Sequence, residues 1–119
     1  MDEKQRFTIY DKILDFNSYI RKYIVVNIPS VNRDLRIHLL DECYNLLKDM
    51  FSAIYNKGNI RMKYLIEMKV TVSLIDMLLT EIGNLKCQKN KYITTSISKL
   101  EDIKNIIYGW IINEESKTK

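Results

Sequence analysis

The fold is indicated most clearly by the stretch from Ile60 to Leu85, which reads IRMKYLIEMKVTVSLIDMLLTEIGNL. Its apolar residues recur every three or four positions, the spacing that places side chains on one face of an α-helix. This spacing is kept by Leu65, Met68, Val72, Ile75, Leu79 and Ile82. Leu74, Met77 and Leu78 add a second apolar face, and a helix that is apolar on more than one face is buried on more than one side. We therefore expect a long helix that packs against several others.

Three further segments have the same periodicity, and their predicted bounds are Thr8–Val25, Asn32–Asn56 and Tyr92–Ile112. Their apolar stripes are, in order, Ile9, Ile13, Phe16, Ile20 and Tyr23; Leu40, Cys43, Leu47, Met50 and Ile54; and Ile93, Ile97, Leu100, Ile103 or Lys104, Ile107 and Ile111. The connections between the segments are short, which favours antiparallel packing of consecutive helices. The sequence therefore predicts an all-α, antiparallel up-down-up-down four-helix bundle.

The breaks between the segments carry residues that end or start helices. Pro29 cannot continue a helix and pushes Ile28 out of helical geometry. Asn32 is a good N-cap for the second helix. At the next connection, Gly58 can take the left-handed conformation and Asn59 can cap the third helix.

Length and composition indicate one domain over residues 1–119, with an ordered core at about 8–112 and a polar C-terminal tail at 113–119 that we expect to fray. The N-terminal residues show no apolar run typical of a signal peptide. No apolar stretch approaches the ~20 residues that span a bilayer. We therefore expect a cytoplasmic protein with no membrane partner.

Residues that could carry catalysis are few. His38 is the single histidine, and neither Cys43 nor Cys87 shows the arrangement of a nucleophile with its base. A di-iron bundle needs Glu-x-x-His motifs, which are absent, and Gly58, Gly83 and Gly109 form no phosphate-binding loop. We therefore expect no enzyme activity, metal or cofactor, and two reduced thiols in or near the core.

Positive charge gathers at one end of the predicted bundle. The net charge is +4, from 19 basic and 15 acidic residues. The helix order brings together Arg21, Lys22, Arg33, Arg36, Lys86, Lys89 and Lys91, with Asp34 as the nearby acid, whereas the opposite end mixes both signs. This basic end is a candidate surface for phosphate contacts, which need clustered Lys and Arg. The alternative is that the charges only solvate the surface and complement the dipoles of helix C-termini.

Some apolar residues exceed what one stripe per helix requires. They are Leu74, Leu78, Ile106, Tyr108 and Trp110. Trp and Tyr are favoured at protein interfaces, so these residues are candidates for an oligomer contact. A wide core stripe with Trp110 packed inside explains them equally well.

Two parts of the chain resemble a known family. Tyr10–Asp15, followed by Ile28-Pro29, resembles the opening helix and loop of the accessory variability proteins of diversity-generating retroelements. The tail from Ile103 to Ile111, with Gly109-Trp110-Ile111, resembles their closing Gly-Trp-Ile signature, and the spacing from Asn84-Leu85-Lys86 to Trp110 matches as well. The resemblance covers about residues 9 to 112.

This resemblance implies a four-helix bundle that assembles as a homopentameric ring, a fold shared with proteins encoded in intervening sequences of large-subunit ribosomal RNA genes. It also implies a partner reverse transcriptase, binding of RNA and DNA through a basic surface, and support of mutagenic cDNA synthesis without a catalytic centre.

The sequence departs from the family at some of the expected contacts. Members often carry two arginines on the third helix, where Asp76 and Thr80 stand here, and Lys104-Asn105 lies near the place of an arginine before the closing Gly-Trp. Either the basic end replaces those contacts, or this chain binds mainly protein. Three hypotheses follow: an accessory subunit of a reverse transcriptase, a bundle of the intervening-sequence type, or a structural bundle that binds only protein.

Overall fold

Four long helices make up most of the computed structural model, which describes residues 3–117 apart from the side chains of residues 3, 5 and 7. They are α1 (Glu3–Tyr19), α2 (Arg33–Tyr55), α3 (Gly58–Asn84) and α4 (Asn90–Lys117). No strand occurs in this part of the chain. The expectation of an all-helical fold is therefore confirmed.

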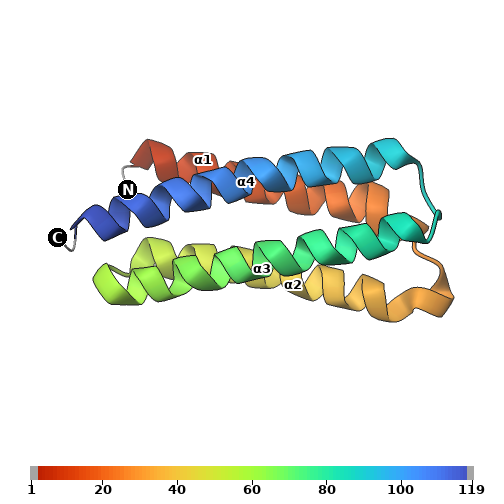
Figure 1. The fold of residues 1–119 in the computed structure, drawn as a ribbon, viewed down its shortest axis with the longest axis horizontal. Coiled ribbons are helices and arrows are strands. Elements are labelled where there is room, and N and C mark those ends of the chain that lie inside the picture. Colours follow the sequence, from red (N-terminus) through yellow and green to blue (C-terminus); the bar gives the residue numbers. More distant parts are fainter. Residues whose placement is uncertain (1–2, 118–119) are drawn as a thin grey trace.

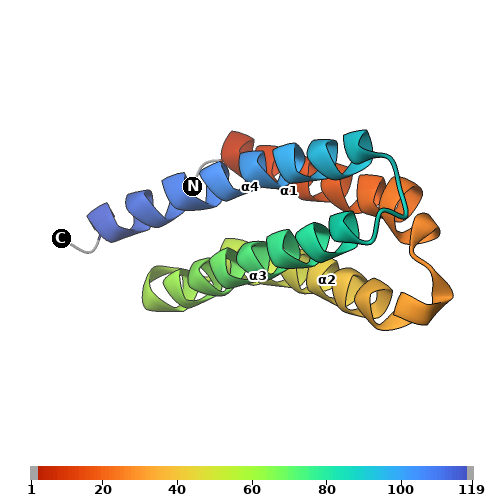
Figure 2. The same cartoon turned by 45° about the vertical axis from the view of Figure 1, so that its right-hand side comes forward.

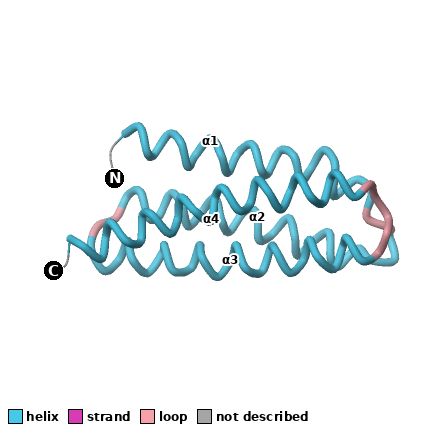
Figure 3. Tube along the Cα trace, turned by 45° about the horizontal axis from the view of Figure 1, so that its top comes forward, coloured by secondary structure: helices cyan, strands magenta, loops and turns pink. Residues whose placement is uncertain are grey.

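The helices run alternately up and down along one long axis (Figure 1). Neighbours in sequence pack side by side, and α1 closes the arrangement by packing against α4 as well as α2. The tube view shows the connections gathered at the two ends (Figure 3), and the turned view shows α4 reaching past the other helices at its C-terminus (Figure 2). The molecule is a rod of 49 × 22 × 18 Å, as expected for helices that rise about 1.5 Å per residue.

The core contains the predicted stripe of α3 without exception, because all six of its residues are buried. On α2 the buried face shares Cys43 and Met50 with the predicted stripe and is shifted by one position elsewhere. It consists of Leu39, Cys43, Leu46, Met50 and Ala53. Leu40, Leu47 and Ile54, which we expected in the stripe, are only half-buried. Leu47 and Ile54 pack against the edge of the core. Both sets have helical spacing, and only packing against the other helices distinguishes them.

The connection from α1 to α2 is more elaborate than a helix ended by Pro29. A π-helical turn covers Ile20–Ile24 and is followed by 3₁₀ turns at Val25–Asn27 and Ser30–Asn32. Phe16, Ile20, Ile24 and Ile28 are all buried at a constant spacing of four. An α-helix has 3.6 residues per turn, so this spacing would drift off the core. The wider π turn keeps these side chains pointing inward.

The other helix ends agree only partly with the capping roles predicted from the sequence. Gly58 has φ of +60°, the left-handed conformation expected of it. However, α3 begins at Gly58 with Lys57 as its N-cap, so Asn59 is already helical. The Asn32 side chain makes no capping hydrogen bond to α2. Lys86 also has positive φ, 56°, and turns the chain between α3 and α4.

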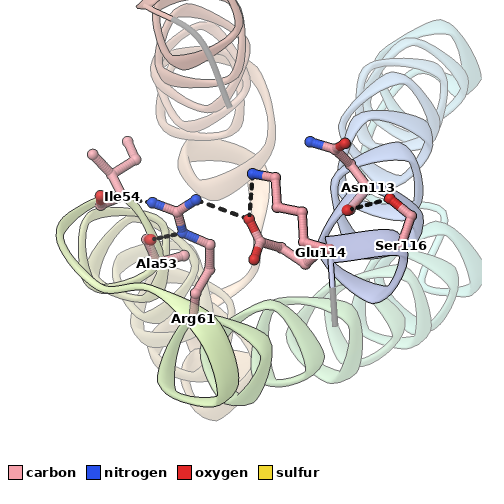
Figure 4. Close-up of polar contacts among 7 residues, drawn as sticks. Ala53, Ile54, Arg61, Asn113, Glu114 and Ser116 are labelled. Atoms are coloured by element: carbon pink, nitrogen blue, oxygen red, sulfur yellow. Dashed lines mark hydrogen bonds and ion pairs between the residues drawn. The ribbon is translucent and has the colours of Figure 1, made fainter. Parts of the chain in front are cut away.

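The largest departure is at the C-terminus, where we expected residues 113–119 to fray. α4 instead continues through residues 113–117, and residues 118–119 lie outside the described part of the chain. Glu114 is buried at 4% exposure beside Arg61 at 5%. Arg61 Nη1 donates to Glu114 Oε1 at 2.9 Å, and Arg61 Nε donates to the Ala53 carbonyl at 2.8 Å (Figure 4).

Through its contacts, Arg61 connects α3 to both α2 and α4. Arg61 also donates through Nη2 to the Ile54 carbonyl at 3.3 Å, so it satisfies two carbonyls of the last turn of α2. Its guanidinium lies 5.6 Å from the centre of the Trp110 ring. Burial opposes ionisation of Glu114, but hydrogen bonds from Arg61 and Lys117 outweigh burial and hold the pKa of Glu114 below its ordinary value. The last turns of α4 are thereby held to the α2–α3 connection.

Candidate nucleic-acid interface

The basic end forms where the structure joins α1 to α2 and α3 to α4 (Figure 1). Arg21 and Lys22 lie in the π turn, Arg33 and Arg36 in the first turn of α2, Lys86 and Lys89 between α3 and α4, and Lys91 in the first turn of α4. Residues 19–36 and 81–92 contain these seven cations and two acids, Asp34 and Glu81. Glu81, in the last turns of α3, is therefore a second acid at this end, in addition to Asp34, which the sequence analysis named.

The seven cations do not have equal freedom to meet a ligand. Arg36 is half-buried, and its Nη2 donates to the Ile28 carbonyl at 2.7 Å, which ties the connection to α2. Arg21 donates to the Tyr44 hydroxyl, and its guanidinium lies 5.1 Å from the centre of that ring. We therefore assign Arg36 a mainly structural role and regard Arg21 as partly committed to Tyr44.

The lysines and Arg33 are exposed to solvent. Lys22 Nζ lies 5.3 Å from the ring centre of Tyr23, and Lys91 Nζ lies 5.3 Å from that of Tyr92. Such exposed cation–π contacts are weak, about 0.5–1 kcal/mol. They restrain the lysines without preventing them from reaching a phosphate.

The sequence analysis placed Tyr23 in the apolar stripe of the first helix and did not group it with the other tyrosines of this end. Tyr19 and Tyr23 are spaced by four on the first helical segment, and Tyr92 begins α4. The rings of Tyr23 and Tyr92 are stacked with centroids 5.0 Å apart. The spacing of Tyr19 and Tyr23 was a usable signal, but the contact with Tyr92 depends on α1 packing against α4.

The five candidate oligomer residues divide into two groups. Leu78 and Trp110 are buried within the single chain, at 5% and 3% exposure, and Ile106 is half-buried. Leu74 and Tyr108 are more than a third exposed. On α3, Leu74 belongs to a wider exposed apolar face with Ile66, Val70 and Met77.

The candidates for reactive chemistry differ in their exposure to solvent. His38 is exposed on α2. Burial raises the pKa of the Cys43 thiol to about 12, and Cys87 is half-buried. Within residues 3–117, no group of three or more His, Cys, Asp and Glu side chains is placed to hold a metal ion. Nor is any helix in this range long and apolar enough to cross a membrane.

A pair of acids lies in the seam between α2 and α3. Asp49 and Glu67 line a groove of about 390 Å³, together with Lys48, Ile66 and Thr71 among others. Burial, followed by the nearby charge of Glu67 and a hydrogen bond with it, raises the pKa of Asp49 to about 6. Asp49 therefore prefers to be protonated in mildly acidic solution.

Comparisons of this chain with protein-family models, curated proteins and solved structures gave no match.

Proposed function

We propose that this chain is a non-catalytic accessory protein that binds RNA or DNA through its basic end and assists a reverse transcriptase of a diversity-generating retroelement. The retroelement part of this proposal comes from the resemblance of residues 9 to 112. The nucleic-acid part is carried by one observation. Five exposed cations from four different helix ends gather at one end of the rod with two acids, as phosphate contacts require; they are Lys22, Arg33, Lys86, Lys89 and Lys91.

The proposal includes self-assembly, for which the resemblance implies a homopentameric ring. The exposed face of Ile66, Val70, Leu74 and Met77 on α3 supports it, because an apolar row of this kind on a helix is typical of a protein contact. A ring would repeat the basic end in every subunit. Weak contacts to one strand would then add through effective concentration.

Charge reversal tests the nucleic-acid part. The triple variant Lys86→Glu, Lys89→Glu and Lys91→Glu removes three exposed lysines of the basic end. The matched control is Lys4→Glu, Lys57→Glu and Lys63→Glu, which changes the net charge equally with exposed lysines of the opposite end. Binding to a fluorescent oligonucleotide is measured by anisotropy, with helicity and mass checked for each variant.

The triple variant should bind at least tenfold more weakly than the control. Equal binding by both variants would refute the basic end as the binding surface. If the parent chain itself shows no binding to RNA or DNA, the nucleic-acid function is wrong.

The exposed apolar face of α3 favours a second candidate function, a structural bundle that binds only protein. Co-purification with a reverse transcriptase or another protein, combined with no affinity for nucleic acid, would favour that function. A bundle of the intervening-sequence type is the third candidate, and its gene would lie within a ribosomal RNA gene rather than beside a reverse transcriptase.

A further inference from the structure

The basic end carries a row of three tyrosines along the seam between α1 and α4. Tyr19 and Tyr23 have ring centroids 4.6 Å apart and are tilted by 45°. Tyr23 and Tyr92 are nearly parallel, at 21° and 5.0 Å. All three rings are half-buried, so their bodies seal the seam while part of each remains at the surface. We call Tyr19, Tyr23 and Tyr92 the tyrosine row.

Each ring of the row has its own lysine. The Nζ atoms of Lys99, Lys22 and Lys91 lie 5.3 Å from the ring centres of Tyr19, Tyr23 and Tyr92, respectively. Lys99 also pairs with Asp15 at 2.5 Å. A lysine ammonium therefore lies beside each ring of the row, and Asp15 is paired with one of these lysines.

The backbone beneath the tyrosine row contains a π-helical turn. Lys22 and Tyr23 belong to the π turn, and Tyr19 directly precedes it. Single π turns in helices occur frequently at functional sites. Asn27 Nδ2 donates to the Tyr23 carbonyl at 2.9 Å and closes the exit from this turn. The stacked rings and the packed seam hold the row in place before any ligand arrives, which lowers the entropic cost of binding.

We propose that the tyrosine row is a stacking platform for the bases of single-stranded nucleic acid, with Lys22 and Lys91 contacting the phosphates on either side. This inference rests on the proposed nucleic-acid function and specifies its ligand. In a duplex the base faces are covered by neighbouring bases, so only an unpaired strand can offer them to a side chain.

The contacts of the lysines with the rings are weak enough for a base to replace a lysine on a ring. The described row ends at Tyr19 and Tyr92, whose rings have Lys99 and Lys91 beside them. An exposed lysine–ring contact strengthens an interaction only about two- to fivefold. A base stacked on an aromatic ring contributes about five- to 150-fold. A lysine with a long flexible stem can leave the ring to a base and move its ammonium to a phosphate.

The test compares two ligands on the full-length chain. One is a fluorescent oligothymidylate, and the other is an abasic strand of the same length, which keeps the phosphates and lacks the bases. The variants are Tyr92→Leu, which removes an end ring, and Tyr92→Phe, which keeps it. Tyr55→Leu is the control, because Tyr55 is an 81% exposed tyrosine at the opposite end of the rod.

The parent should bind oligothymidylate at least fivefold more tightly than the abasic strand. Tyr92→Leu should lose most of that preference, while Tyr92→Phe and Tyr55→Leu should keep it. Asp15→Asn, which removes the acid from the surface, should strengthen binding of both ligands. The circular-dichroism spectrum of Tyr92→Leu should show unchanged helicity. If that variant unfolds, the comparison of the two ligands on the parent decides.

Salt-sensitive but equal binding of the two strands by the parent would overturn the stacking platform and leave the proposed phosphate contacts standing. Absence of binding to either strand would overturn both.

Discussion

Breaking the Arg61–Glu114 ion pair should destabilise the bundle strongly, because both groups are almost fully buried. Removing one partner of a buried pair typically costs about 3–5 kcal/mol, since the other charge stays buried without compensation. Arg61→Met removes the pair and the hydrogen bonds to the Ala53 and Ile54 carbonyls. Glu114 retains a second ion pair, with the half-exposed Lys117, whose Nζ lies 3.3 Å from Glu114 Oε1. We therefore expect the lower part of the range, about 3 kcal/mol.

A double-mutant cycle separates the pair from its surroundings. Glu114→Leu alone should also cost about 3 kcal/mol, because it leaves the Arg61 charge buried. The variant Arg61→Met with Glu114→Leu leaves neither charge uncompensated and should cost at least about 2 kcal/mol less than the sum of the single changes. The assay is urea unfolding followed by circular dichroism, at pH 7 and one fixed protein concentration.

The pH dependence gives a second reading of the same pair. The folded-state pKa of Glu114 is lowered from its ordinary value of 4.5. Its contribution to stability is therefore present above that value and is lost as the pH falls further.

Two results would refute the conclusion that this ion pair holds the end of α4 to the α2–α3 connection. One is a coupling energy in the double-mutant cycle below about 0.5 kcal/mol, within the range of additive sites. The other is a cost of Arg61→Met under about 1 kcal/mol, which is typical of a surface pair.

Three further outcomes follow from the buried groups. Trp110→Ala should lower the free energy of unfolding by about 3–5 kcal/mol, because Trp110 is buried within one chain; a variant that dissociates an oligomer but stays equally stable would contradict this. Asp49→Asn should stabilise the protein at pH 7 by about 1–2 kcal/mol, a value reduced for screening in the open groove. The variant is the more stable protein at pH 7 because the pKa of Asp49 is raised in the folded state: the parent loses the stability contributed by protonated Asp49 as the pH rises from about 4 to about 6. The free energies of unfolding of parent and variant, measured at both pH values, check this. Iodoacetamide should label Cys87 before Cys43 in the folded protein, because burial raises the pKa of Cys43 to about 12; mass spectrometry showing the reverse order would place Cys43 at the surface.

The sequence was sufficient for the helices and for the face that α3 buries. Leu65 to Ile82 repeat with one strict heptad spacing, and this selects the core face correctly. The second apolar face that we expected is buried only at Leu78, whereas Leu74 and Met77 are more than a third exposed. On α2, however, Leu39 and Leu40 start two stripes of equal spacing. The choice between them depends on how the helix is rotated toward its neighbours, which is a tertiary property.

The candidate site was predictable only where it depends on helix order. Up-down topology and short connections were enough to gather the seven cations. The roles of Arg36 and Arg21 were not predictable, because each contacts a group on another segment, the Ile28 carbonyl and Tyr44. Glu114 looked like part of a solvated tail because its partner, Arg61, is 53 residues away in sequence.

The salt dependence of nucleic-acid binding tests the central claim most directly. Log affinity of the parent chain for a single-stranded oligonucleotide is measured against log salt concentration. If the exposed Lys22, Arg33, Lys86, Lys89 and Lys91 each neutralise a phosphate, the slope should be about −3.5 per chain engaged, since each contact on a single strand contributes about −0.7. Charge reversal of Lys86, Lys89 and Lys91 should bring the slope to about −1.4. A flat dependence, or a slope that the reversal leaves unchanged, would contradict the claim that this end of the bundle binds nucleic acid.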